Sequence, residues 1–202
     1  MYKLYFHPFS QHSRRVVSLL NEAGIEHELV LVDLLKGDNM QPSYLALNPN
    51  HKVPTLVDGD FKLYESNAIL RYLCNKHELT DWYPADLKAR ALVDQWMDWN
   101  QTRVATPVFE VVFNKMFAGD NADKAAIERG EKSLAELGKI LDDALAGKSF
   151  LVGDKPTIAD LSVASNATQL QIGQSLPQGA NIAAWLGRMM EIEGFKNAMP
   201  QM

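Results

Sequence analysis

The chain has 202 residues and a mass of 22.6 kDa, which is enough for one large domain or two small ones around a buried core. Apolar residues make up 47% and charged residues 22%, and this balance argues against a disordered or collagen-like chain. The net charge of -5 offers no excess positive field to a phosphate backbone, so no nucleic acid is expected as a partner.

Cysteine usage and hydropathy favour a cytoplasmic protein. The single cysteine, Cys74, has no partner for an intrachain disulfide, and the segment from Met1 to Pro8 lacks the apolar core of a signal peptide. No apolar run approaches the ~18 residues of a membrane helix, so no membrane association is expected. The five histidines show no metal-ligand spacing, and no metal is assigned.

The first 78 residues alternate strand and helix patterns. Tyr2 to Phe6 predicts a strand, a helix with apolar residues at i, i+3, i+4 and i+7 follows and ends at Gly24, and His27 to Val32 predicts a second strand. Because a helix separates these strands, they should be parallel in a right-handed βαβ unit.

A short helix, a hairpin and a further helix should complete this first half. Pro42 to Leu47 fits the short helix, and Thr55 to Val57 and Phe61 to Tyr64 flank an Asp-Gly-Asp turn that predicts an antiparallel hairpin. Ser66 is predicted to cap the helix that follows.

After about residue 85 only helical periodicity remains, which predicts two domains. They are residues 1–78 and residues 87–202, with a linker at residues 79–86. In the second domain, two long helices should pair in antiparallel fashion around a turn at Gly119. Thr157 to Asp160 reads as a capping box that starts another helix, and a last amphipathic helix should run through Ile182 to Met189.

Three motifs in the first half carry a resemblance to a known family. They are Ser10-Gln11-His12-Ser13-Arg14-Arg15, Asn48-Pro49-Asn50-His51-Lys52-Val53-Pro54 and Tyr64-Glu65-Ser66-Asn67-Ala68-Ile69. With these motifs in this order, the chain resembles a cytosolic glutathione transferase of the phi and theta type over its whole length. The resemblance implies an α/β thioredoxin-like N-terminal domain (βαβαββα) followed by an all-α C-terminal domain, a homodimer, and glutathione as co-substrate.

Ser10 is the candidate catalytic residue. It stands between the first strand and the first helix, where helix amides and the helix dipole favour an anion such as a thiolate. Spacing alone favours the plainer interpretation that Ser10 or Ser13 is only a helix cap. The resemblance implies that Ser10 donates a hydrogen bond to the glutathione thiolate, while Ser13 is structural.

The same resemblance assigns the remaining glutathione contacts. It implies that Val53, before a cis proline, pairs with the cysteinyl part of glutathione, and that Lys52 approaches the glycine carboxylate. Glu65 and Ser66 are expected to hold the γ-glutamyl end, and Phe9 to flank the site. The loop that often carries His or Lys in the family has Asn39 and Met40 here, so Asn39 is expected to make only a weak contact.

Candidates for the electrophile site lie mainly in the helical half. They are Phe9, Asn100, Arg103, Phe113 and Phe117, expected to border an apolar cleft between the domains. Apolar stripes such as the one that contains Phe113 more often belong to a core. Cys74 is expected to be a packing residue, because a cysteine-dependent transferase would need its thiol at position 10.

The sequence therefore predicts a glutathione transferase that conjugates glutathione to a small apolar electrophile, with a possible peroxidase side activity. An alkyl or aryl halide, an epoxide and a peroxide all remain open as the second substrate. The alternative is a non-catalytic module that keeps the transferase fold for binding or association, since fold does not fix function. Asn39 and Met40 are the residues that favour this alternative.

Overall fold

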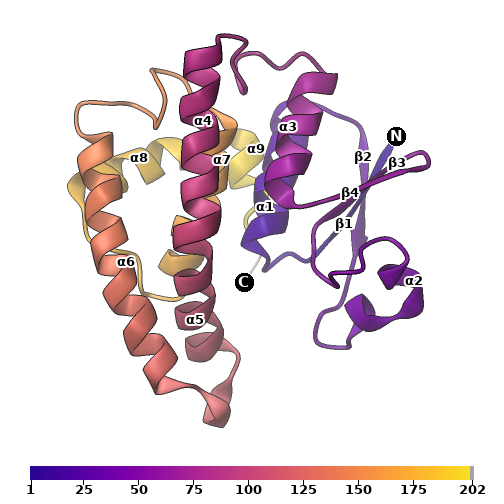
Figure 1. Cartoon of the computed structure of the whole chain (residues 1–202), viewed down its shortest axis with the longest axis horizontal. Helices are drawn as coiled ribbons and strands as arrows, with labels where there is room; N and C mark the ends of the chain where they lie inside the picture. Colours follow the sequence, from indigo (N-terminus) through magenta and orange to yellow (C-terminus); the bar gives the residue numbers. More distant parts are fainter. Residues whose placement is uncertain (201–202) are drawn as a thin grey trace. The chain divides into compact units, whose positions relative to one another are not determined.

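The computed structural model describes residues 1–200, which form two compact units. The first contains Met1–Thr80 and the segment from Glu191 onward, and the second is Asp81–Met190. The first is a thioredoxin-like α/β unit and the second is helical (Figure 1), as the fold-class prediction required. The helical domain was predicted to span residues 87–202, whereas residues 191–200 cluster with the first unit.

The first unit is built on a four-stranded mixed sheet. Its strands are β1 (Tyr2–Phe6), β2 (His27–Leu31), β3 (Thr55–Asp58) and β4 (Phe61–Tyr64), in the order β2-β1-β3-β4. β1 is parallel to β2 and antiparallel to β3, and β3 pairs with β4 as a hairpin. The predicted parallel βαβ unit and antiparallel hairpin are both confirmed.

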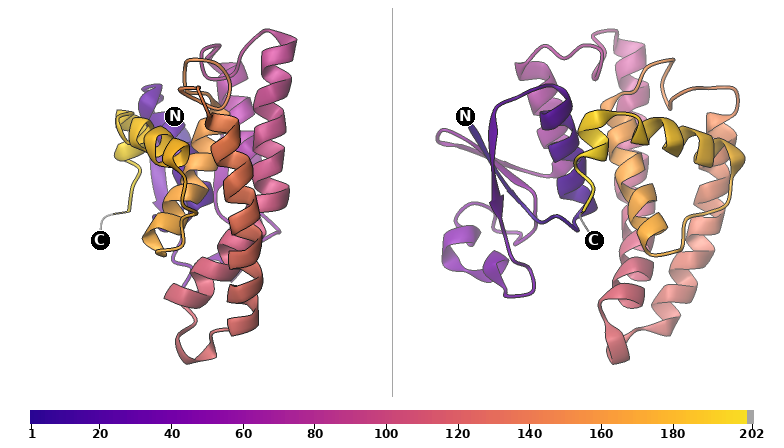
Figure 2. Two further views of the ribbon diagram at one scale, coloured as in Figure 1. Left: turned by 90° about the vertical axis from the view of Figure 1, so that its left-hand side faces the viewer. Right: turned by 180° about the vertical axis from the view of Figure 1, so that it is seen from behind.

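Helices cover both faces of this sheet. α1 (Gln11–Glu22) and α3 (Ser66–Lys76) lie on one face, and α2 (Pro42–Leu45), after a short 3-10 turn at Asp38–Met40, lies on the other (Figures 1 and 2). The side chains of Leu4 and Leu56 are fully buried. On the face covered by α2, the rings of Tyr5 and Tyr44 meet edge to face, with their centroids 6.0 Å apart.

The end of the chain packs against α1. The short helix α9 (Glu193–Lys196) places Phe195 in the interior, and the Gly194 amide donates a 2.7 Å hydrogen bond to the Glu22 carboxylate. A Cβ at Gly194 would lie 2.6 Å from the Ser18 carbonyl oxygen, so any larger residue would push α9 away from α1. The sequence analysis did not predict this helix.

The second unit contains five α-helices among the described residues. They are α4 (Leu87–Trp99), α5 (Ala105–Met116), α6 (Lys124–Leu145), α7 (Ile158–Ile172) and α8 (Ala180–Met190). A π-helical segment, Asn100–Val104, joins α4 to α5, and it was not predicted. α5 and α6 run side by side (Figure 1), and α7 is buried from Ile158 to Leu170.

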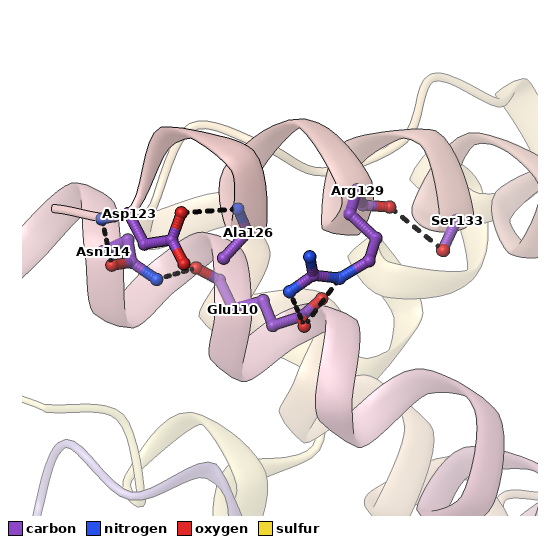
Figure 3. A network of polar contacts seen from close by, with 6 residues as sticks. All are labelled: Glu110, Asn114, Asp123, Ala126, Arg129 and Ser133. Atoms are coloured by element: carbon purple, nitrogen blue, oxygen red, sulfur yellow. Dashed lines mark hydrogen bonds and ion pairs between the residues drawn. The ribbon is translucent and has the colours of Figure 1, made fainter.

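A polar network fixes the turn between α5 and α6 (Figure 3). The Arg129 guanidinium donates two hydrogen bonds to one Glu110 carboxylate oxygen, at 2.6 and 3.1 Å. Asn114 donates to the Glu110 carbonyl and accepts from the Asp123 amide. Asp123 in turn caps α6, because its carboxylate accepts from the Ala126 amide at 3.0 Å.

We expect Asp123→Ala to lower the free energy of unfolding by about 1 kcal/mol, the usual cost of a lost N-cap. Urea unfolding followed by circular dichroism measures this loss. Ser133→Ala is the matched control in the same helix, because the Ser133 hydroxyl only donates to the Arg129 carbonyl on an exposed face. Equal midpoints for the two variants would contradict the capping role of Asp123.

Candidate active site

Ser10 lies at the end of the β1–α1 loop and is the N-cap of α1. Its hydroxyl oxygen accepts a 3.2 Å hydrogen bond from the Ser13 amide. His7 holds the loop in place: its carbonyl accepts from the Ser10 amide at 3.0 Å, and its ring accepts from the Phe9 amide at 3.3 Å. Ser10 is therefore the residue that caps α1.

Capping leaves the proton of the Ser10 hydroxyl available. A hydroxyl has one O–H donor and two acceptor lone pairs, and the cap uses one lone pair. Across residues 1–200, the Ser10 hydroxyl donates no hydrogen bond. No acidic residue occupies the first turn of α1, so no side-chain charge there offsets the positive end of the helix dipole. The cap and an interaction with an anion are thus compatible.

Two cations, Arg15 and Lys52, lie close enough to His12 at the start of α1 to affect its pKa. Burial lowers the pKa of His12 to about 3, and the charges of Arg15 and Lys52 act in the same direction. His12 is therefore neutral at neutral pH. Burial also lowers the pKa of Arg15, to about 9, so this guanidinium remains a cation. The sequence analysis quoted His12 and Arg15 within a motif but gave neither a role.

The His12 pKa predicts how stability depends on pH. Between about pH 3 and pH 6.5 the unfolded chain binds a proton that the folded chain does not, so His12 makes the free energy of unfolding rise with pH. The slope within this window is at most about 1.4 kcal/mol per pH unit. We expect His12→Gln to lose less stability than the wild type between pH 7 and pH 4 in urea unfolding. If the free energy of unfolding depends on pH in the same way for the two proteins, the prediction is refuted.

The loop before β3 is tightly held. The Lys52 carbonyl accepts hydrogen bonds from the Tyr44 hydroxyl at 2.6 Å and from the Asn48 amide at 2.9 Å. The Val53–Pro54 peptide bond is cis, as the resemblance implied. Across residues 1–200, no hydrogen bond engages the backbone of the buried Val53, which leaves its amide and carbonyl for an extended ligand.

Of the two candidate side chains near this loop, Lys52 is exposed and Asn39 holds the loop backbone. The Lys52 side chain is exposed. The Asn39 side chain donates a 2.9 Å hydrogen bond to the His51 carbonyl, so its nitrogen serves to hold the loop. One N–H of the Asn39 amide and its oxygen remain for other contacts, and only the N–H suits a carboxylate.

The start of α3 corrects one prediction. Ser66 was predicted to cap this helix, but it is the first helical residue, and Glu65 occupies the cap position without a side-chain capping bond. Glu65 has φ 67° and ψ 105°, a conformation that costs a non-glycine residue about 1–3 kcal/mol and is concentrated at ligand sites. Because the Glu65 side chain does not cap the helix, the Ser66 amide at the start of α3 is available to an anion.

The electrophile candidates in the second unit separate into buried and exposed groups. Asn100 is fully buried, and its amide donates to the Ser162 carbonyl and hydroxyl and accepts from Asn166. This side chain is used by internal packing, contrary to the expectation that it borders a cleft. Arg103, in the π-helical segment, is exposed.

The aromatic residues of α5 are not part of the core. Phe109, Phe113 and Phe117 are 58%, 43% and 48% exposed. Their rings stack in sequence, with centroids 5.0 Å apart for the first pair and 6.4 Å for the second. The core interpretation of this stripe is therefore wrong, and α5 presents an exposed aromatic face. Phe9, in the first unit, is partly exposed in the loop that carries Ser10.

Other reactive groups are few in the described part of the chain. Cys74 is buried, and burial raises the pKa of its thiol to about 12, which fits a packing residue. Between residues 1 and 200, no cluster of His, Cys, Asp and Glu side chains could hold a metal ion. None of the helices described there has the length and hydropathy needed to cross a bilayer.

A thioredoxin-like unit with a capping serine and a cis proline, joined to a helical unit, defines the class of protein, and comparisons with known proteins identify the family. The model "Glutathione S-transferase, N-terminal domain" matches residues 4–81, and "Glutathione S-transferase, C-terminal domain" matches residues 124–188. Human glutathione S-transferase theta-2 is 36% identical over 97% of this chain and 82% of its own length. Glutathione S-transferase F10 of Arabidopsis thaliana is 38% identical over 77% of this chain and 74% of its own length.

Solved structures agree with these matches. Human glutathione transferase theta-2, in complex with glutathione and an unknown ligand, superposes with a TM-score of 0.91 at 33% identity and covers 98% of this chain and 86% of its own. The theta class enzyme of Xanthomonas axonopodis pv. citri, with glutathione bound, gives 0.90 at 28% identity over 100% and 98% of the two chains. The chain belongs to the glutathione S-transferase family, and it is a transferase.

Proposed function

We propose that this transferase activates the glutathione thiol at Ser10 and transfers the sulfur to a small apolar electrophile. The observation that carries the proposal is the Ser10 hydroxyl, which caps α1 through its oxygen and keeps its proton. An unperturbed thiol has a pKa near ~8.5, and lowering it by ~2 units requires roughly 2.7 kcal/mol of preferential stabilisation of the thiolate. One charge-assisted hydrogen bond together with a helix dipole is of that size.

The remaining glutathione contacts follow from the first unit. The free backbone of Val53 suits the cysteinyl peptide, and the exposed Lys52 ammonium suits the glycine carboxylate. The Ser66 amide suits the γ-glutamyl carboxylate, and the Glu65 carboxylate suits the ammonium group beside it. Asn39 is at most a weak contact in this proposal, because one of its two N–H donors holds the His51 carbonyl and only the other can reach a carboxylate.

The reaction needs no covalent bond to the protein. With a halide or an epoxide, the thiol proton leaves to solvent, the thiolate attacks carbon, and a carbon–sulfur bond forms as the halide departs or the epoxide C–O bond breaks with its electron pair. With a peroxide, the thiolate attacks oxygen as the O–O bond breaks, and a second glutathione then gives glutathione disulfide and water. Ser10 donates its hydrogen bond throughout and is not the nucleophile. The chain then contributes thiol activation and the positioning of the reactants.

For the second substrate we infer an apolar electrophile bound at the exposed aromatic face of α5. Phe113 and Phe117 present stacked rings there, and Arg103 adds a cation from the adjoining segment. An alkyl halide, an aryl halide, an epoxide and a peroxide are the classes to compare.

Two measurements test the proposed function. Isothermal titration with glutathione should give measurable heat, and glutathione should raise the thermal midpoint, because a ligand that binds only the folded state stabilises it. Steady-state assays with one member of each class should then give conjugation of a halide or an epoxide, or reduction of the peroxide with formation of glutathione disulfide. A chain that neither binds glutathione nor consumes any of these electrophiles would instead be a binding or association module.

We also propose that the protein is a homodimer in the cytoplasm. Its similarity to the glutathione transferases supports the dimer, and the single buried Cys74 suits a reducing compartment. Light scattering at micromolar concentration should give twice the mass of one chain. A monomer mass would refute the dimer.

A further inference from the structure

A buried hydrogen bond joins the two helices whose N-termini carry the proposed glutathione contacts. The Arg15 side chain of α1 donates through Nη1 to the Oδ1 atom of Asn67 in α3, at 3.0 Å. Arg15 is fully buried and Asn67 is 8% exposed. The two residues are 52 positions apart in the sequence, so the bond is a tertiary contact between elements on one face of the sheet.

The position of this bond relates it to both ends of the proposed ligand. Asn67 directly follows Ser66, at the start of α3, and Arg15 lies five residues after Ser10 on α1. At about 1.5 Å per residue, five residues are about 7.5 Å of a rigid helix. A bond that fixes Arg15 against Asn67 therefore fixes the distance between the sulfur site at Ser10 and the γ-glutamyl site at Ser66.

A directional contact is needed here because apolar packing is not directional. α1 and α3 also pack against each other, and each buries apolar side chains, such as Leu19 in α1 and Ile69 in α3. Apolar surfaces tolerate small shifts along a helix. The Arg15 guanidinium is a buried cation that requires polar partners. The Arg15 Nη1 atom can donate to the Asn67 oxygen only when α1 and α3 keep their relative position along the helix axes.

We propose that Asn67, through Arg15, is a positioning residue of the transferase that sets the separation of the two helix N-termini. The inference rests on the proposed function, because the separation matters only for a ligand that binds at both ends. Glutathione would then lose affinity when the bond is removed, and its sulfur would move away from the Ser10 hydroxyl. Displacements of about 1 Å are enough to cost large factors in an aligned site.

The test compares Asn67→Ala with Asn67→Asp, which keeps an oxygen for Arg15, and with Tyr72→Phe. Tyr72 also lies in α3, and its hydroxyl donates to Asp58 on β3 at 2.5 Å, so this control removes a tertiary bond of α3 at a distance from its first turn. Calorimetry measures the affinity for glutathione. The ultraviolet absorbance of the bound thiolate against pH measures the thiol pKa, which a purely structural role of Asn67 would not change.

We expect Asn67→Ala to weaken glutathione binding about tenfold or more, because the two helix N-termini are then no longer held at the separation that the ligand spans, and to raise the pKa of the bound thiol. Asn67→Asp should recover most of the affinity, and Tyr72→Phe should match the wild type in both measurements. If the wild type binds glutathione and Asn67→Ala shows the same affinity and the same thiol pKa, this inference alone is overturned. Equal losses of glutathione affinity in Asn67→Ala and Asn67→Asp would also overturn it. A wild type that does not bind glutathione would overturn the proposed function and this inference with it.

Discussion

The Ser10→Ala protein is expected to bind glutathione as a thiol at neutral pH. A hydrogen bond to a charged group is worth about 1.5–3 kcal/mol, so its loss should raise the pKa of the bound thiol by about 1–2 units. The thiolate fraction at pH 7 then falls, and kcat/KM should fall about tenfold or more with it. Titration of the thiolate absorbance of the bound ligand, with kcat/KM measured across the same pH range, checks both effects.

The nearby hydroxyl of Ser13 supplies the control for this experiment. It accepts a 3.3 Å hydrogen bond from the His7 amide and has no part in the proposed thiol activation. Ser13→Ala should therefore keep the thiol pKa of the wild type, and Ser10→Thr should restore it because a hydroxyl is retained. An unchanged titration in Ser10→Ala would remove Ser10 from the proposed role and leave it as a helix cap.

Loss of the cap is a separate effect that the same variant reveals. Ser10 accepts from the Ser13 amide, so Ser10→Ala should also lose about 1 kcal/mol of unfolding free energy. Because this loss concerns stability in the absence of ligand, it can be measured without glutathione. The two roles of Ser10 are thus distinguished by two independent measurements.

Features that depend on neighbouring residues were predictable from the sequence. The parallel pairing of β1 with β2 follows from the helix between them, and the hairpin follows from the turn after Asp58. The capping box at Thr157 and Asp160 is also present, because its two hydrogen bonds need only a spacing of three residues. The family resemblance added the cis bond before Pro54, which no local pattern specifies.

Features that depend on tertiary contacts were not predictable. Asn100 continues the apolar stripe of α4, but only the fold shows that Ser162 and Asn166 satisfy its amide. Helical spacing could not show whether the Phe113 face is buried, since the same spacing serves a core and an open face. The helix start at Glu65 depends on a positive φ, which sequence patterns do not associate with glutamate.

The site shows the same division. The serine, the cis proline and the residues at the start of α3 lie in contiguous motifs, so a resemblance was enough to propose them as site residues. The Arg15–Asn67 bond joins two of these motifs, and no spacing within either one indicates it. The neutral state of His12 likewise depends on burial and on nearby positive charges, one of which is Lys52 in another motif.

The largest effect on stability is expected at Asp160 in the second unit. Its carboxylate accepts four hydrogen bonds: from the amides of Leu151 and Thr157 at 2.9 Å, from the Thr157 hydroxyl at 3.0 Å, and from the Trp185 indole at 2.9 Å. Asp160 and Trp185 are fully buried. Burial raises the pKa of Asp160, and the four donors oppose that shift by stabilising the ionised form.

We expect Asp160→Ala to lower the free energy of unfolding by about 3–5 kcal/mol, because the change leaves several buried donors without an acceptor. For a chain of this length the thermal midpoint should fall by about 10 °C or more. Thr157→Ala is the comparison, since it removes one hydroxyl of the same capping box and should cost only about 1 kcal/mol. Calorimetry of the three proteins checks the order of these effects.

Asp160→Asn tests whether the charge or only the shape is needed. Each carboxylate oxygen accepts two hydrogen bonds, Oδ1 from Leu151 and Trp185 and Oδ2 from Thr157. An asparagine keeps one oxygen but turns an amide NH₂ group toward the other pair of donors. The Thr157 hydroxyl can accept from that group, but either orientation leaves at least one buried amide N–H without an acceptor. Asp160→Asn should therefore be clearly less stable than the wild type. If it matched the wild type, the convergence of donors on a carboxylate would not be what stabilises the start of α7.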